Sequence, residues 1–330
     1  MILTRTPYRI SFFGGGTDYP GWYRDEGGVV ISTSIDKYCY INCRHLPPFF
    51  DHKYRIVYSA IENVMEPSEI QHPAVREVLR YMCCDQGLEI HHDGDLPARS
   101  GLGSSSSFTV GLLHALKALN GEQVCHDSLA KMAIHVEQNL IKESVGSQDQ
   151  VAAAYGGFNR IDFHRNGDFS VAPIILPESR LKHLQDHLML FFTGFSRIAS
   201  EIAQSQIQNI SARHSELTQI MQMADEAMSV LQGTGSLDDF GALLHEGWTL
   251  KKTLSNRISN QDLDHIYDAA LKAGALGGKL LGAGGGGFML FFVKPELQGQ
   301  VLESLHDLIH VPFRFENSGS RVVLYQPNGF

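Results

Sequence analysis

The stretch Leu96-Pro97-Ala98-Arg99-Ser100-Gly101-Leu102-Gly103-Ser104-Ser105-Ser106-Ser107 is a glycine-containing turn that leads into the apolar-periodic residues 108–119. Serine before such a segment is typical of a helix start, where the first backbone N–H groups have no partner inside the helix. Those N–H groups, the helix dipole and the close approach that glycine permits favour an anion. We therefore expect a helix over 104–119 with a nucleotide phosphate at its N-terminus. The alternative is an ordinary capped helix after a flexible turn.

The size and charge of the chain restrict the classes of protein to which it can belong. At 330 residues it is long for one hydrophobic core, so about two domains are expected. The net charge of −9 indicates no basic surface for nucleic acid or an anionic membrane. Five cysteines without a CxxC pair indicate reduced thiols. We expect a cytoplasmic protein that has neither nucleic acid nor a membrane as a partner.

A second glycine-rich segment, residues 282–287, formally fits the spacing G-x-G-x-x-G. The segment runs into the strand-like residues 288–293, whereas the dinucleotide-binding fingerprint follows a strand and opens a helix. Gly278-Lys279 also lacks the spacing of a Walker A loop. The sequence contains neither the protein-kinase motifs nor a G-x-S-x-G hydrolase motif. These patterns disfavour the Rossmann, P-loop, protein-kinase and α/β-hydrolase classes.

A third glycine-containing segment lies near the start of the chain, at residues 7–20. It has Arg9 inside a predicted strand and Asp18 just after the glycines 14–16. An arginine on the core side of a strand needs an anionic partner, because an unpaired buried charge is costly. The partner is either a ligand or, as the alternative, a structural aspartate.

Hydrophobic periodicity predicts strands interleaved with helices in both halves of the chain, which favours an α+β fold. We expect strands at 2–13, 28–45, 55–58, 88–93, 158–163, 169–175, 188–193 and 288–293, and helices at 73–84, 104–119, 200–231, 238–254, 261–273 and 295–308. A domain boundary is expected near residue 165. It separates an N-terminal domain, 1–165, which carries the phosphate loop, from a C-terminal domain, 166–330.

Taken together and in this order, the three segments resemble the motifs of the GHMP kinases, the superfamily of galactokinase, homoserine kinase and mevalonate kinase. Residues 7–19 resemble motif one, residues 97–106 motif two and residues 279–287 motif three. The resemblance implies a ribosomal-S5-domain-2-like N-terminal domain, a ferredoxin-like C-terminal domain and an active site in the cleft between them. It also implies ATP and Mg²⁺ as cofactors, and it leaves a homodimer open.

Within the superfamily, residues 11–18, 32–38 and 146–150 are similar to the pattern of bacterial heptose 7-phosphate kinases. This similarity implies phosphorylation of the anomeric hydroxyl of D-glycero-alpha-D-manno-heptose 7-phosphate to the 1,7-bisphosphate, as in nucleotide-heptose synthesis. Gly15-Gly16 replaces the Glu-His of galactokinases and leaves room for a longer sugar. A fucose or galactose kinase remains an alternative. A diphosphomevalonate-type decarboxylase and a non-catalytic sensor are further ones.

The resemblance assigns the reaction chemistry to Asp149, with Arg9 beside it. The Asp149 carboxylate would orient the acceptor hydroxyl and accept its proton. Glu137, twelve residues earlier, would hold Mg²⁺ together with Ser104 or Ser105. The alternatives are a helix-capping or turn aspartate at 149 and a solvated helix glutamate at 137.

The resemblance also implies the residues that bind the two substrates. Those expected to bind ATP are Pro97, Ser100, Gly101, Leu102, Gly103, Ser104, Ser105, Ser106, Gly284 and Gly285. The third motif, at Gly284 to Gly286, would pack against the phosphate loop. Those expected to bind the sugar are Gly15, Gly16, Thr17, Asp18 and Arg197, with Lys37 and Lys142 as other candidates for holding a substrate phosphate.

Overall fold

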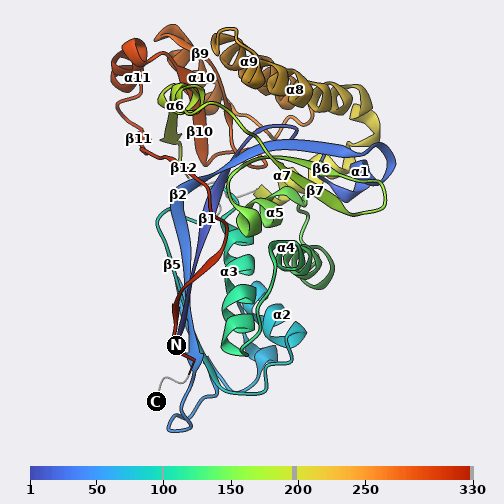
Figure 1. The fold of residues 1–330 in the computed structure, drawn as a ribbon, viewed down its shortest axis with the longest axis vertical. Coiled ribbons are helices and arrows are strands. Elements are labelled where there is room, and N and C mark those ends of the chain that lie inside the picture. The colour runs from blue at the N-terminus through green and yellow to red at the C-terminus, as the bar shows by residue number, and fades with distance from the viewer. Residues whose placement is uncertain (99, 195–198, 328–330) are drawn as a thin grey trace.

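The computed structural model of the chain describes residues 1–98, 100–194 and 199–327. The described strands form two sheets, and helices pack on both (Figure 1). The larger sheet extends along the lower part of the view, and the smaller sheet lies above it with α8 to α11. The α+β class predicted from the interleaved patterns is confirmed.

Among the described residues, the larger sheet has nine strands. Their order is β13-β1-β2-β5-β3-β4, with β12 and β6 paired to β2 and with β7 paired to β6. The pairings are antiparallel except that of β3 with β5. The strands are β1 (Ile2–Phe13), β2 (Gly28–His45), β3 (Tyr54–Val57), β4 (Ile61–Val64), β5 (Leu88–Gly94), β6 (Phe158–Phe163), β7 (Phe169–Pro173), β12 (Phe315–Glu316) and β13 (Arg321–Tyr325).

The central pair of this sheet is the long antiparallel pair of β1 and β2. The predicted strands at 2–13 and 28–45 are confirmed. The register shifts between Pro7, opposite Tyr38, and Tyr8, opposite Ile35, which leaves residues 36 and 37 as a bulge in β2. Bulges redirect neighbouring side chains. Beyond this bulge, the side chains of Arg9 and Ser11 lie on the same face of β1, because side chains alternate along a strand.

Helices cover one side of the larger sheet (Figure 1). The predicted helix at 104–119 is confirmed as α3 (Ser104–Leu119), which packs against β1 and β2 through a largely buried apolar surface. The other helical elements here are α1 (Pro20–Glu26), η1 (Pro67–Glu69), α2 (Pro73–Tyr81), α4 (His126–His135), the π-helical turn η2 (Val136–Ile141) and α5 (Gln148–Tyr155). This packing fixes the N-terminus of α3 beside β1.

The smaller sheet is antiparallel, with the order β11-β8-β10-β9. Its strands are β8 (Leu188–Phe192), β9 (Ala275–Leu280), β10 (Phe288–Val293) and β11 (Ile309–His310). The helical elements of this part are α6 (Glu178–Asp186), α7 (Ala199–Gln208), η3 (Ser211–Arg213), α8 (His214–Gln232), α9 (Asp238–Thr253), α10 (Gln261–Lys272), η4 (Pro295–Leu297) and α11 (Gln298–Ser304). The turn before α3 and the glycine run 282–287, which joins β9 to β10, approach each other closely.

The prediction of one helix over 200–231 is wrong, because the helix is broken between α7 and α8. Asn209 lies at the break, and its Nδ2 donates a hydrogen bond to the Leu254 carbonyl at 3.2 Å. An asparagine side chain that bonds to backbone elsewhere competes with helix continuation. The apolar periodicity continues through the break, so the sequence pattern alone did not indicate it.

The last two strands return to the larger sheet, where β13 pairs with β1 and β12 with β2. The expected boundary at residue 165 falls in the hairpin between β6 and β7. The division into 1–165 and 166–330 therefore stays a prediction, and strands from both ranges build the larger sheet.

Two features of the described chain concern its surroundings. Within the described ranges, no helix has the length and apolar character that crossing a membrane requires. The cysteines at 39, 43, 83, 84 and 125 are all free. The expectation of reduced thiols therefore agrees with the structure.

A close backbone crossing holds the returning C-terminal segment against the end of α5. Gly156 has φ +67, and a Cβ there would lie 2.0 Å from the carbonyl carbon of Ser318. Ser320 N donates to the Ala153 carbonyl at 3.0 Å on the same side. The crossing therefore requires glycine at 156 both for its backbone conformation and for its lack of a side chain.

We expect Gly156→Ala to lower the free energy of unfolding by about 3 kcal/mol, because a left-handed conformation and a steric overlap each cost about 1–2 kcal/mol. Gly167→Ala is the matched control: its φ is +89, but nothing lies within 4 Å of the added Cβ. It should cost only about 1 kcal/mol. Urea unfolding measures both variants, and equal losses would show that the crossing does not restrict residue 156.

Candidate active site

An ion pair between β1 and α5 lies at the centre of the site. Arg9 Nε donates to Asp149 Oδ1 at 2.7 Å, and Arg9 Nη2 donates to Asp149 Oδ2 at 2.8 Å. Arg9 is 4% exposed, whereas about a quarter of the Asp149 side chain is accessible. Such bidentate pairs fix both geometry and charge. The anionic partner that the sequence requires for Arg9 is therefore Asp149, which presents an open side to solvent.

Arg9 also connects this pair to the phosphate loop. Its Nη1 donates to the Gly101 carbonyl at 2.6 Å, and its backbone N donates to the Leu102 carbonyl at 3.1 Å. A Cβ on Gly103 would lie 3.3 Å from Arg9 Cγ and 3.4 Å from Asp149 Oδ2. The loop is therefore held directly against the ion pair, and the predicted proximity of Arg9 and Asp149 is confirmed.

The start of α3 differs from the predicted serine-capped helix. Gly103 is the N-cap residue, with φ +75, and no side chain of the described residues caps this end. The Ser106 hydroxyl donates to Glu137 and the Ser107 hydroxyl to the Pro7 carbonyl. These hydroxyls bond elsewhere and do not cap the helix, so the positive end of the α3 dipole still favours an anion here.

The third motif packs against the loop at two glycines. A Cβ on Gly282 would lie 2.5 Å from Gly101 Cα, and a Cβ on Gly287 would lie 2.3 Å from the Ser100 carbonyl. The packing was expected at Gly284 to Gly286, but the nearest neighbour of a Cβ on Gly284 is Ile258, at 2.8 Å. The close contact is thus made at both ends of the glycine run, and the expected packing of residues 284–286 on the loop stays a prediction.

Asp18 connects the glycine turn of motif one, residues 14–16, to the start of α5. Its Oδ1 accepts from Gly16 N at 3.0 Å, its Oδ2 from Gln148 N at 3.2 Å, and a Cβ on Gly146 would overlap its carboxylate. Burial raises the pKa of Asp18, as does the nearby charge of Asp149. A role for Asp18 in sugar binding stays a prediction, since both of its carboxylate oxygens bond to backbone.

Thr17 and Gly16, two other residues predicted to bind the sugar, are also buried in this turn. Thr17 Oγ1 donates to the Gly14 carbonyl at 2.8 Å. A Cβ on Gly16 would lie 3.3 Å from Leu217 Cδ2 of α8. Gly15 is the more exposed residue of the turn. The hydrogen bonds inside the turn fix its shape. Contacts of the turn with a sugar stay predictions.

Glu137 is fully buried in η2, so the alternative of a solvated helix glutamate is wrong. Its Oε2 accepts hydrogen bonds from Ser106 Oγ, at 2.9 Å, and from Gln150 Nε2. By hydrogen-bond geometry its Oε1 has no partner within the described part of the chain, but the nearby Thr109 hydroxyl, which donates to the Ser105 carbonyl, partly offsets the effect of burial on the Glu137 pKa. Burial raises the pKa of Glu137 to about 7. A buried carboxylate oxygen without a partner is a suitable ligand for a divalent cation.

The serine beside Glu137 is Ser106, although Ser104 or Ser105 was expected there. Ser105 is exposed, and its carbonyl accepts from Thr109 Oγ1 at 3.2 Å. Successive helical residues point in different directions, so Ser106 faces η2 while the neighbouring Ser105 faces solvent. The π-helical turn itself gave no sequence signal, and such turns often lie at functional sites.

Of the three cations considered for a substrate phosphate, the structure describes Lys37 and Lys142. Arg197 lies outside the described residues. Lys37 pairs with Asp36 at 3.6 Å in the β2 bulge, and Lys142 has φ +62 after η2. The sequence reasoning missed the partly buried Lys251 and the buried Lys279, whose ammonium groups donate to backbone carbonyls of motifs three and one. Lys279 is part of motif three, but no pattern distinguished Lys251 from other helical lysines.

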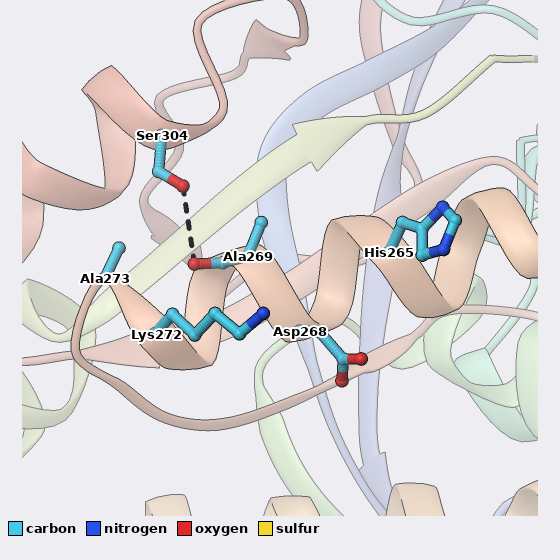
Figure 2. Close-up of a pocket in the computed structure, with 6 residues that line it drawn as sticks. All are labelled: His265, Asp268, Ala269, Lys272, Ala273 and Ser304. Carbon is cyan, nitrogen blue, oxygen red and sulfur yellow. Dashed lines mark hydrogen bonds between the residues drawn. The ribbon is translucent and has the colours of Figure 1, made fainter.

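A separate surface cavity lies between α10 and α11 (Figure 2). His265, Asp268 and Lys272 project from successive turns of α10, and Ser304 Oγ donates to the Ala269 carbonyl at 3.3 Å. The residues that line this cavity include none of those predicted for the site. It is therefore distinct from the candidate site at the phosphate loop.

Comparisons with known proteins agree with the geometry. The model of the GHMP kinases N terminal domain matches residues 57–157, and the model of the GHMP kinases C terminal domain matches residues 223–309. The chain is 30% identical, over 92% of its length and 93% of the relative, to D-glycero-alpha-D-manno-heptose 7-phosphate kinase of Campylobacter jejuni. It is 23% identical to the bifunctional fucokinase/GDP-fucose pyrophosphorylase of Arabidopsis thaliana, over 87% of this chain and 29% of that protein.

A solved structure gives the same fold. The D-glycero-D-manno-heptose 1-phosphate kinase from Bacteroides thetaiotaomicron superposes with a TM-score of 0.79 and 24% identity, over 97% of this chain and 98% of that chain. The family models cover both parts of the chain, and the Campylobacter relative matches nearly its full length. Because the three motifs also meet at one point of a shared fold, the chain belongs to the GHMP kinase superfamily and has its two-domain fold.

Proposed function

We propose that this protein is an ATP-dependent kinase that phosphorylates the anomeric hydroxyl of D-glycero-alpha-D-manno-heptose 7-phosphate. The observation that carries the proposal is the Arg9–Asp149 pair, whose carboxylate is partly accessible to solvent. The pair is held against the N-terminus of α3, which has no side-chain cap among the described residues. The heptose 7-phosphate kinase from Campylobacter, at 30% identity, supports this substrate. Kinases for fucose remain an alternative, supported by the weaker similarity to the plant fucokinase.

Asp149 is suited to orient an acceptor hydroxyl. Both of its carboxylate oxygens accept hydrogen bonds from Arg9, so the carboxylate has a fixed direction as well as a neutralising partner. Phosphoryl transfer through a loose transition state needs little early proton removal. Asp149 therefore acts mainly by positioning the hydroxyl, and it accepts the proton late.

The N-terminus of α3 supplies the site for the phosphates of ATP. Its first N–H groups and the turn at residues 100–103 provide backbone donors, and the dipole of α3 favours negative charge. Motif three reinforces the turn from the other side. The residues expected to bind ATP keep that assignment as part of the proposal.

Glu137 and Ser106 would hold Mg²⁺, because the unpartnered Oε1 of Glu137 and the Ser106 hydroxyl are oxygen ligands beside the α3 terminus. When bound, the cation supplies neutralisation of the phosphate charge. Glu137 must be ionised for this role, so Gln150 and Ser106 assist by donating hydrogen bonds to its other oxygen. A cytoplasmic location and a possible homodimer stay predictions.

The purified protein should release ADP with heptose 7-phosphate as acceptor, and ³¹P NMR should find the new phosphate on the anomeric carbon. Asp149→Asn should lower kcat by about 10²–10⁴ with the KM for ATP nearly unchanged. Asp162→Asn is the matched control, because Asp162 also accepts from an arginine Nε, that of Arg160, at 2.9 Å. Turnover of fucose alone would replace the heptose proposal, and full activity of Asp149→Asn would remove its role.

Metal-nucleotide binding should depend on pH through Glu137. Its pKa is raised from 4.5 to about 7, so protonated Glu137 stabilises the free protein at low pH and this contribution is lost as the pH rises through 7. Ionised Glu137 is the ligand, so the affinity for Mn²⁺-AMPPNP should fall about tenfold per pH unit below 7. Glu137→Gln should bind weakly without that dependence.

Calorimetric titrations between pH 5.5 and 8 measure this difference. Glu122→Gln, which alters an exposed ion pair with Lys117, serves as the control and should follow the unmodified protein. If Glu137→Gln keeps the same pH profile, the titration belongs to the nucleotide phosphate and Glu137 is not a ligand.

A further inference from the structure

Two lysines, the partly buried Lys251 and the buried Lys279, donate hydrogen bonds to backbone carbonyls near motifs one and three. Lys251, on α9, donates to the Gly282 carbonyl at 2.6 Å, and Lys279, on β9, donates to the Phe12 carbonyl at 2.7 Å. Within the described part of the chain, neither ammonium forms an ion pair with a carboxylate. An ammonium has three donors. Both groups therefore keep hydrogen-bonding capacity beyond their carbonyl partners.

The same two lysines and the turn line one small cavity. Its walls include Gly14 and Gly15 from the turn and Lys251 and Lys279 from the opposite side. Apolar side chains of α8 and α9 close the remainder, among them Ile220. The cavity thus lies between the motif-one turn and the C-terminal helices, and both lysines contribute to its lining.

Other polar atoms around the turn also lack partners. Ser11 is 6% exposed, and its hydroxyl has no hydrogen-bond partner among the described residues. A Cβ on Gly15 would lie 3.8 Å from that hydroxyl and 3.6 Å from Gln148 Nε2. The Gln148 Oε1 is likewise without a partner in the described chain. Buried polar groups without partners are rare in proteins and indicate a missing ligand.

The charges here do not balance within the protein. Asp149 neutralises Arg9, and burial raises the pKa of Asp18, which disfavours its charged form. Burial and the nearby cations lower the pKa of Lys251 to about 8 and that of Lys279 well below its usual range. Holding like charges together in a low-dielectric region is costly unless an anion compensates them. The lowered pKa values mean that the protein alone does not compensate two charged ammonium groups here, and a bound anion would favour their charged forms.

We propose that Lys251 and Lys279 form the subsite for the phosphate group that the acceptor sugar carries. This inference rests on the proposed function and adds the residues that select a phosphorylated sugar. The nucleotide phosphates have their own site on the α3 terminus, whereas the lysine cavity is lined by the Gly14–Gly15 turn. The flexible stems of the lysines would move their ammonium groups from the carbonyls to the phosphate, and Ser11 would donate a further hydrogen bond.

Lys251→Met keeps the apolar stem and removes the charge. We expect it to raise the KM for heptose 7-phosphate about 10- to 100-fold, as for the loss of a charge-assisted hydrogen bond, with the KM for ATP within about twofold. The KM for the dephosphorylated heptose should be unchanged. The adjacent Lys252→Met is the matched control, because Lys252 pairs with Asp264 at 3.1 Å and is half-exposed. An equal increase in the KM for both sugars, or an increase in the KM for ATP, would overturn the proposal of this subsite.

A binding experiment separates this inference from the identity of the sugar. Inorganic phosphate is titrated calorimetrically into the protein saturated with Mg²⁺-AMPPNP, so that the nucleotide site is filled. The unmodified protein and Lys252→Met should bind phosphate, and Lys251→Met and Lys279→Met should bind it at least about tenfold more weakly. Circular dichroism of each variant establishes that it is folded. Undiminished phosphate binding by both folded lysine variants would refute the subsite, whichever sugar the enzyme phosphorylates.

Discussion

The structure depends on a buried guanidinium that must have an anionic partner. Arg9 lies in β1, where almost none of it is accessible, and water cannot compensate its charge. Its two bonds to Asp149 and its bond to the Gly101 carbonyl satisfy the guanidinium and connect three segments that are far apart in the sequence. Removing either partner of such a pair leaves an uncompensated charge, which costs about 3–5 kcal/mol. The same pair therefore stabilises the fold and orients the reactive carboxylate.

Glycine contacts extend this constraint to the second half of the molecule. Gly101 and Gly282 approach so closely that neither has room for a Cβ. The phosphate loop is thus enclosed between the ion pair and the strand-turn-strand unit of β9 and β10. Lys251 bonds to the carbonyl of the same Gly282, so α9 is connected to the loop as well. A change in how the two sheets pack would alter the loop, the ion pair and the lysine cavity together.

Local patterns predicted much of this site, and tertiary packing decided the rest. The α3 helix and the strands β1 and β2 follow from periodicity, and three motifs were enough to indicate the family and the ion pair. The helical phase that turns Ser106 rather than Ser105 toward Glu137 depends on the angle at which η2 packs on α3. The place of Lys251 at the cavity depends on α8 and α9 packing beside the glycine turn of motif one, and a lysine on a helix gives no local sign of that. These contacts join residues that are far apart in the sequence, so no short segment of the sequence predicts them.

The central claim is that Arg9 and Asp149 act as one unit, and a double-mutant cycle in kcat tests it most directly. The variants are Arg9→Met, Asp149→Asn and their combination, each assayed at saturating ATP and acceptor, with unfolding curves recorded in parallel. The account predicts that each single variant lowers kcat by about 10²–10⁴ and that the combination is little worse than the more impaired single variant. If the fold-losses in kcat of the two single variants multiply in the combined variant, as for two independent residues, the account is contradicted.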